Sequence, residues 1–180
     1  SAASDVYKRQ GLFTLSSCTA PTNVKDYSAY VNPFIGTGGH GHTFPGAVVP
    51  HGMIQPSPDT RIDGWDACSG YYYADSTING FSHTHVSGTG CCDYGDVLLM
   101  PTVGKQQYRT TDPQSQRLAY ASSFSHKNEI AEPGYYSVFL DTYQVKAEIS
   151  STKRGAIHRY TFPENTESGF IIDLDYSLQP

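Results

Sequence analysis

Trp65 is the only tryptophan in this chain, and it lies in a polar loop between Gly64 and Asp66. A tryptophan of a protein core usually lies in an apolar strand. A loop tryptophan beside a carboxylate is typical of a sugar platform, where pyranose C–H groups stack on the indole and the carboxylate accepts hydroxyl hydrogen bonds. The alternative is a core or hinge tryptophan, and the residues alone leave both interpretations open.

Histidines form a second group of candidate residues. His40 and His42 lie in a glycine-rich loop, and His83 and His85 lie two positions apart, so that on a strand they would share a face. Together they could hold a transition metal. The pattern favours hydrogen-bonded loop histidines instead, because the sequence has neither a helical His-Glu-x-x-His motif nor a His–Cys spacing that closes a zinc site.

The sequence assigns no catalytic residue. It has no Gly-x-Ser-x-Gly elbow for a serine nucleophile, and residues 32–47 are not followed by the Gly-Lys-Ser/Thr of a phosphate loop. A pair of carboxylates for acid and base catalysis could come from the loop aspartates, but their spacing does not say which of them face each other. These aspartates are Asp59, Asp63, Asp66, Asp93 and Asp96.

Four cysteines, Cys18, Cys68, Cys91 and Cys92, are too few for a disulfide scaffold and have the wrong spacing for a zinc finger. We expect the neighbours Cys91 and Cys92 to be one packed and one surface thiol, not a vicinal bridge. A disulfide from Cys68 to one of them stays open for a protein in an oxidising compartment.

Composition narrows the class of protein. The formal net charge is −5, and no cluster of Lys and Arg interleaves with aromatic residues, so we do not expect a nucleic-acid partner. No apolar run approaches the roughly 20 residues that cross a bilayer. Charged residues make up 16% and aromatic residues 13%, with 14 tyrosines, a composition common in β-structured and sugar-binding proteins.

The first residues predict two segments that do not belong to the folded domain. Residues 1–10, SAASDVYKRQ, match the translation of a transposase sequencing adapter, so we expect an artefact. Residues 11–18 resemble the tail of a bacterial lipoprotein signal peptide, with a lipobox that ends in a lipidated Cys18; the alternative is a frayed apolar terminus. Residues 19–26 would be a linker. The lipobox predicts a secreted periplasmic or outer-membrane lipoprotein of a Gram-negative bacterium, in contact with membrane only through its lipid.

Several short segments alternate between apolar and polar residues, as half-buried strands do. No window longer than about 12 residues has a clear helical period. Residues 27–180 are therefore predicted to form one all-β domain, an antiparallel β-sandwich. Because a sandwich needs more strands than these, we expect it to be incomplete at its C-terminal end. The expected strands are 96–101, which Pro101 would stop, 134–140, 144–151, 156–162 and 169–174.

The ordered set of loop motifs resembles the N-terminal domain of glycoside hydrolase family 92. Each motif alone is weak, but their joint order from about Tyr27 to Asp173 is specific. The motifs are YVNPFIGT (30–37), PGA (45–47), PHGM (50–53), GFSHTHVSGTGC (80–91), DYGD (93–96), FSH (124–126), EIAEPGYY (129–136) and RGAIH (154–158).

The resemblance implies a calcium-dependent, inverting exo-α-mannosidase that acts on mannose-containing glycans such as N-glycans. In this family a β-sandwich of the galactose-mutarotase-like, or supersandwich, type packs against a C-terminal (α/α)6 barrel. The barrel supplies the catalytic carboxylates and most calcium contacts, so no metal ligand is assigned here. The sandwich contributes a tryptophan to the leaving-group subsite, which Trp65 matches. The other expected substrate-binding residues are Asp66, His83, His85 and Cys91.

The expected partners are thus a mannose-containing oligosaccharide and the chain's own barrel, without which the sandwich would be inactive. Two other functions stay open. A standalone carbohydrate-binding sandwich would keep Trp65 and lack catalysis. A periplasmic metal-binding protein would use His40, His42, His83 and His85, of which the first two rank lowest as sugar contacts.

Overall fold

The computed structural model of the chain describes residues 25–106, 108, 117–164 and 167–178. The expected adapter segment 1–10, the signal-peptide remnant 11–18 with Cys18, and most of the linker 19–26 lie outside the described residues. Within the described ranges, no helix is both long and apolar enough to span a membrane.

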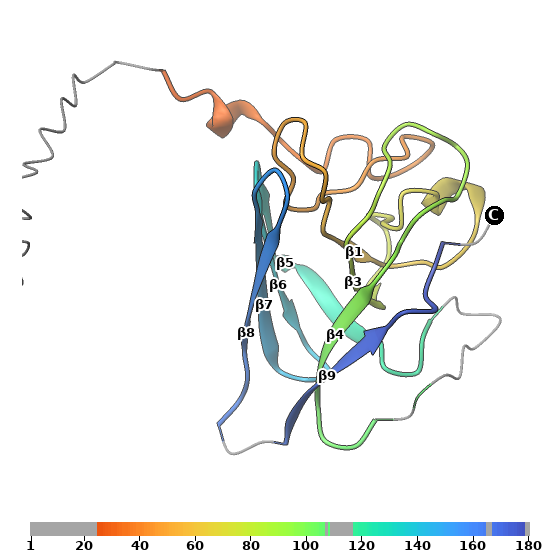
Figure 1. The fold of residues 1–180 in the computed structure, drawn as a ribbon, viewed down its shortest axis with the longest axis vertical. Helices are drawn as coiled ribbons and strands as arrows, with labels where there is room; N and C mark the ends of the chain where they lie inside the picture. Colours follow the sequence, from red (N-terminus) through yellow and green to blue (C-terminus); the bar gives the residue numbers. More distant parts are fainter. Residues whose placement is uncertain (1–24, 107, 109–116, 165–166, 179–180) are drawn as a thin grey trace, which may run out of the picture.

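Two antiparallel sheets make up the domain (Figure 1). The first has the strand order β1-β3-β4-β9 and the second β2-β5-β6-β7-β8. No α-helix occurs in the part of the chain that the structure describes, so the predicted all-β, antiparallel two-sheet fold is confirmed. The strands are β1 (Ser57–Asp59), β2 (Thr77–Ile78), β3 (Gly80–Ser82), β4 (Leu98–Val103), β5 (Ser122–Glu132), β6 (Tyr135–Leu140), β7 (Val145–Ser151), β8 (Ala156–Thr161) and β9 (Ser168–Asp173), with short 3-10 helices η2 (Ser28–Tyr30) and η3 (Trp65–Ala67).

Local sequence explains the second sheet. Gly134 has φ +76° and makes the tight turn from β5 to β6, a conformation that glycine adopts without cost. Residues of β7 such as Val145 and Ile149 point into the core, while Lys146 between them is exposed. The predicted strands 134–140, 144–151 and 156–162 match β6, β7 and β8 to within about one residue at each end.

The prediction that Pro101 ends its strand is wrong. β4 runs from Leu98 to Val103, and Pro101 pairs with Phe170 of β9. On the other side, the pairing of β4 with β3 involves only Leu99, opposite Phe81. Pro101 therefore lies where one side of β4 has no strand partner among the described residues, and a residue without a backbone N–H is tolerated there.

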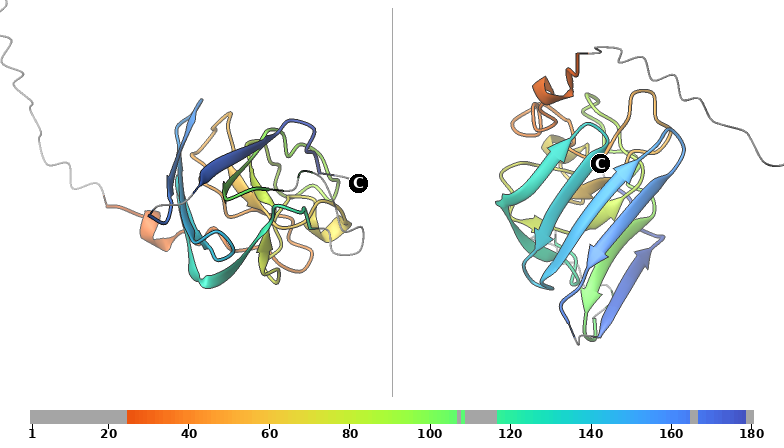
Figure 2. Two further views of the ribbon diagram at one scale, coloured as in Figure 1. Left: turned by 90° about the horizontal axis from the view of Figure 1, so that it is seen from below. Right: turned by 90° about the vertical axis from the view of Figure 1, so that its left-hand side faces the viewer.

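The two sheets lie face to face and enclose the core (Figure 2). Both sheets contribute fully buried apolar side chains, as expected for a sandwich. The core includes Ile78, Phe81, Leu98, Met100, Tyr136, Val138, Leu140, Val145, Ala147 and Ile149.

Three long loops lie together beside β1 and β3, at the upper right of Figure 1. Hydrogen bonds connect them: the Ser69 hydroxyl donates to the Thr43 carbonyl, and the Gly88 amide donates to the His42 carbonyl at 2.7 Å. The loops span residues 32–56, 60–76 and 83–97, and they carry the residues that the sequence singles out.

Candidate functional site

Trp65 opens the short helix η3 and is 56% exposed, so it is not a core residue. Gly64 before it has φ +95°, which lets the chain turn and present the indole outward. The ring lies edge-on to His42, with centroids 4.4 Å apart, and 4.9 Å from the ring of His40. Two imidazoles of the loop 32–56 thus pack against the indole, and more than half of the Trp65 side chain stays accessible to a ligand.

Asp66 follows the indole and is held by the same loop. One carboxylate oxygen lies 2.5 Å from Nδ1 of His40. Both side chains are accessible to solvent, with exposed fractions of 37% for Asp66 and 73% for His40. The structure thus brings the predicted pair Trp65 and Asp66 together with His40 and His42, which the sequence ranked below other residues.

The third loop closes on the indole at Gly90. A Cβ atom at this position would lie 2.6 Å from Nε1 of Trp65 and 3.1 Å from the His42 ring. Only glycine therefore fits while the indole keeps its place. Next to it, Thr89 offers its carbonyl oxygen to Nδ1 of His42 at 3.3 Å. Gly90 and Thr89 were not among the predicted site residues, although they belong to the motif GFSHTHVSGTGC (80–91).

The three cysteines in the described residues are free thiols with different surroundings. Cys91 is exposed, whereas Cys92 is half-buried with its Sγ 3.3 Å from Sγ of the buried Cys68. Burial, and then the hydrogen bond with Cys68, raise the pKa of the Cys92 thiol to about 12. Cys91 and Cys92 are thus one surface and one packed thiol without a vicinal bridge, and Cys92, not Cys91, is the neighbour of Cys68.

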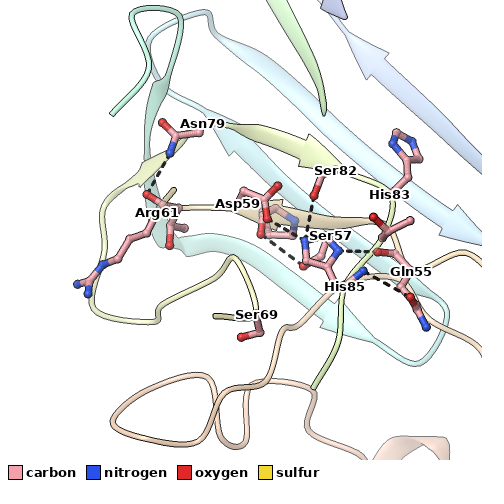
Figure 3. Close-up of polar contacts among 12 residues, drawn as sticks. Gln55, Ser57, Asp59, Arg61, Ser69, Asn79, Ser82, His83 and His85 are labelled. Carbon is pink, nitrogen blue, oxygen red and sulfur yellow. Dashed lines mark hydrogen bonds and ion pairs between the residues drawn. The ribbon is translucent and has the colours of Figure 1, made fainter. Parts of the chain in front are cut away.

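His85 is buried in a cluster of polar side chains (Figure 3). It is 1% exposed; its Nδ1 lies 2.7 Å from the Gln55 carbonyl oxygen, and its Nε2 lies 2.8 Å from Asp59 and 3.1 Å from the Ser82 hydroxyl. Asp59 is fully buried as well. This polar cluster connects β1, β3 and the loop after β3, and the predicted contact of His85 with substrate stays a prediction.

His83 points away from His85, because both residues follow the end of β3 at Ser82 and do not share a strand face (Figure 3). Nδ1 of His83 donates to the Val97 carbonyl at 2.7 Å. When His83 is neutral, its Nε2 accepts from Nε2 of His158, 3.1 Å away, and Nδ1 of His158 then accepts from the Tyr160 hydroxyl at 2.8 Å. Burial, and then His83, lower the pKa of His158 to about 4.

Glu129 is a buried carboxylate that sequence reasoning missed. It accepts hydrogen bonds from the hydroxyls of Tyr71 and Tyr136, at 3.0 and 2.6 Å, and lies 2.6 Å from Nδ1 of His126. Burial, and then the charge of Glu129, raise the pKa of both tyrosines well above the usual value. Only the Phe-Ser-His and Glu-Ile-Ala-Glu motifs could have pointed to it, and neither shows that the two meet.

Comparison with known proteins agrees with this architecture. The model of the glycosyl hydrolase family 92 N-terminal domain matches residues 30–180. The chain therefore belongs to glycosyl hydrolase family 92 and is an N-terminal domain of that family.

Solved structures of the family superpose on the chain. A family 92 α-mannosidase from Bacteroides thetaiotaomicron is 44% identical with a TM-score of 0.79, covering 84% of this chain and 20% of that protein. The same mannosidase has been solved with mannoimidazole. An inverting family 92 mannosidase from Bacteroides thetaiotaomicron VPI-5482 is 32% identical with a TM-score of 0.66, covering 80% of this chain and 19% of that protein.

A fungal relative extends the comparison. An uncharacterized secreted glycosidase of Arthroderma benhamiae is 32% identical over 143 residues, which are 78% of this chain and 18% of the relative. The chain thus spans about one fifth of the length of the relatives it matches.

Proposed function

We propose that this chain is the N-terminal, substrate-contacting domain of a secreted, calcium-dependent, inverting exo-α-mannosidase that acts on mannose-containing glycans. The observation that carries the proposal is the exposed indole of Trp65, which His40 and His42 support beside the carboxylate of Asp66. Mannosidase activity in two family members of known structure supports the substrate class.

The geometry suits binding of a pyranose. The open face of Trp65 can take the C–H groups of a sugar ring, since aromatic rings offer a large apolar surface. Asp66, beside it, can accept hydroxyl hydrogen bonds, and His40 fixes the direction of its carboxylate. In this arrangement Trp65 and Asp66 bind and orient the leaving-group sugar.

Hydrolysis itself needs groups from elsewhere. Inversion requires a general acid and a general base with carboxyls roughly 6.5–9.5 Å apart, so that a water fits between base and sugar. We expect both from the C-terminal (α/α)6 barrel that the family resemblance implies, and we expect this domain alone to be inactive.

Calcium does not fit the cluster around Trp65. Ca²⁺ takes six to eight oxygen ligands, whereas this cluster offers two imidazoles and the carboxylate of Asp66. We therefore expect the barrel to supply the calcium ligands.

An apolar surface on β9 supports the barrel as a partner. β9 is the outer strand of the first sheet, and Phe170, Ile172 and the following Leu174 are each more than half exposed. Contiguous apolar side chains on an unpaired sheet edge are typical of a surface that another domain covers. The secreted location draws support from the secreted fungal relative and from the lipobox that ends at Cys18.

Saturation-transfer NMR of the chain with methyl α-mannoside tests the sugar site. The proposal predicts transfer to the sugar protons that is lost in Trp65→Ala and kept in Ile157→Ala, a control at an exposed apolar residue of β8. Transfer that Trp65→Ala leaves unchanged would contradict the assignment of Trp65. The exposed indole equally favours the second candidate, a carbohydrate-binding sandwich without catalysis. An assay of hydrolysis by the whole protein separates the two candidates.

A further inference from the structure

His40, His42 and Asp66 form a cluster with the chemistry of a metal site, here called the His–His–Asp cluster. Each residue offers one ligand atom, and these atoms all lie within 4.8 Å of one another. Ligands of one zinc ion at about 2.0–2.2 Å lie roughly 3–4 Å apart. A rotamer change of His40, whose side chain is 73% exposed, can close this gap at the cost of its present hydrogen bond with Asp66.

His42 supplies an independent observation. It is 6% exposed, and its Nε2 has no hydrogen-bond partner among the described residues. A buried imidazole nitrogen without a partner is costly unless something occupies its lone pair.

The tautomer of His42 agrees with a role as ligand. The carbonyl of Thr89 can only accept, so the proton of His42 resides on Nδ1, and Nε2 carries a lone pair. A backbone carbonyl that holds one ring N–H while the other nitrogen faces the metal is the usual arrangement at histidine metal sites.

We propose that the His–His–Asp cluster binds a divalent transition metal of the zinc class. Two imidazoles and one carboxylate, with further positions open to water, suit Zn²⁺ or Ni²⁺ and not Ca²⁺. The site differs from the four-histidine set that the sequence suggested, because His85 is buried against Asp59 and His83 pairs with His158. The proposal goes beyond the proposed function and does not depend on it.

The only tryptophan of the chain reports on this site directly. Both imidazoles of the cluster lie within 4.9 Å of the Trp65 ring. Ni²⁺, which is paramagnetic, should quench the fluorescence of Trp65 in a saturable titration of the untagged, reduced chain. Zn²⁺ should compete, and a chelator should restore the signal.

Variants locate the ion. His40→Ala changes an exposed residue and should weaken Ni²⁺ binding at least about tenfold, as should Asp66→Asn, since loss even of a residue that only supports a ligand costs 10–100-fold. His83→Ala is the matched control and should leave the titration unchanged. Thermal unfolding without metal should show that His40→Ala is folded.

Three outcomes would overturn the proposal. The first outcome is Ni²⁺ quenching that is equally strong in His40→Ala and in Asp66→Asn. The second is loss of Ni²⁺ binding in His83→Ala, which would assign the ion to the His83–His158 pair. The third is binding lost in Cys91→Ser or Cys92→Ser while His40→Ala keeps it, which would assign the ion to thiols.

Discussion

The Nε2 atoms of His83 and His158 lie 3.1 Å apart although the residues are 75 positions apart in the chain. His83 follows β3 of the first sheet and His158 belongs to β8 of the second, so the pair joins the two sheets of the sandwich. With both rings neutral, His158 donates to His83 and accepts from Tyr160, whereas protonation of both rings would set two positive charges against each other.

The free energy of unfolding should therefore fall as the pH falls through the range that the pKa of His158 sets. Its folded pKa of about 4 lies below the ordinary 6.5, so the stabilisation is complete above about pH 6.5 and is lost as pH falls toward 4. The shift corresponds to at most about 3 kcal/mol, and less for a half-buried ring. Urea unfolding between pH 7.5 and pH 4 should show that the free energy of unfolding depends less on pH in His158→Gln than in the unchanged chain. An equal pH dependence in the two proteins would contradict this account.

The Asp59–His85 pair predicts a larger effect on folding. Both side chains are fully buried, so His85→Ala leaves a carboxylate without its partner in the core. We expect a loss of about 3–5 kcal/mol in the free energy of unfolding. His40→Ala breaks the exposed pair with Asp66 and should cost less than about 1 kcal/mol. Similar losses in the two variants would show that burial does not govern these pairs.

Gly90 predicts a defect confined to the sugar site. In Gly90→Ala the new Cβ would lie 2.6 Å from Nε1 of Trp65, so the indole must move. We expect a shifted fluorescence maximum and at least about tenfold weaker binding of α-mannosides, which corresponds to about 1.4 kcal/mol. Gly155→Ala, where the nearest atom is 3.9 Å away, is the control. An unshifted indole spectrum in Gly90→Ala would argue against the close approach.

Thiol reactivity should separate Cys91 from Cys92. Cys91 is exposed, whereas the Cys92 thiol is half-buried with a pKa raised to about 12, so its reactive thiolate is scarce at pH 8. A chromogenic disulfide reagent should react quickly with Cys91, and Cys91→Ser should remove that phase. If Cys92→Ser removes it instead, the two thiols are exchanged relative to the structure.

The sequence predicted β6, β7 and β8 from the alternation of apolar and polar residues. It missed β1, β2 and β3, because two or three residues are too few to show a period. It also missed the longer β5, whose pairing with β6 shifts register between Phe124 and Glu129. At the site, loop composition left open whether Trp65 is a sugar platform or a core residue, and only the family resemblance favoured the first; the structure shows that Trp65 is exposed. The separation of His83 from His85 could not be predicted, since it depends on where β3 ends and on the burial of Asp59.

The most direct test of the central claim is to extend the reading frame beyond Pro180 in the source DNA, express the whole product and follow an α-mannoside by proton NMR. The account predicts an (α/α)6 barrel after this domain, release of mannose first as the β-anomer, and a raised KM in Trp65→Ala. A folded whole protein that releases no mannose from α-mannosides, or that releases the α-anomer first, would contradict it.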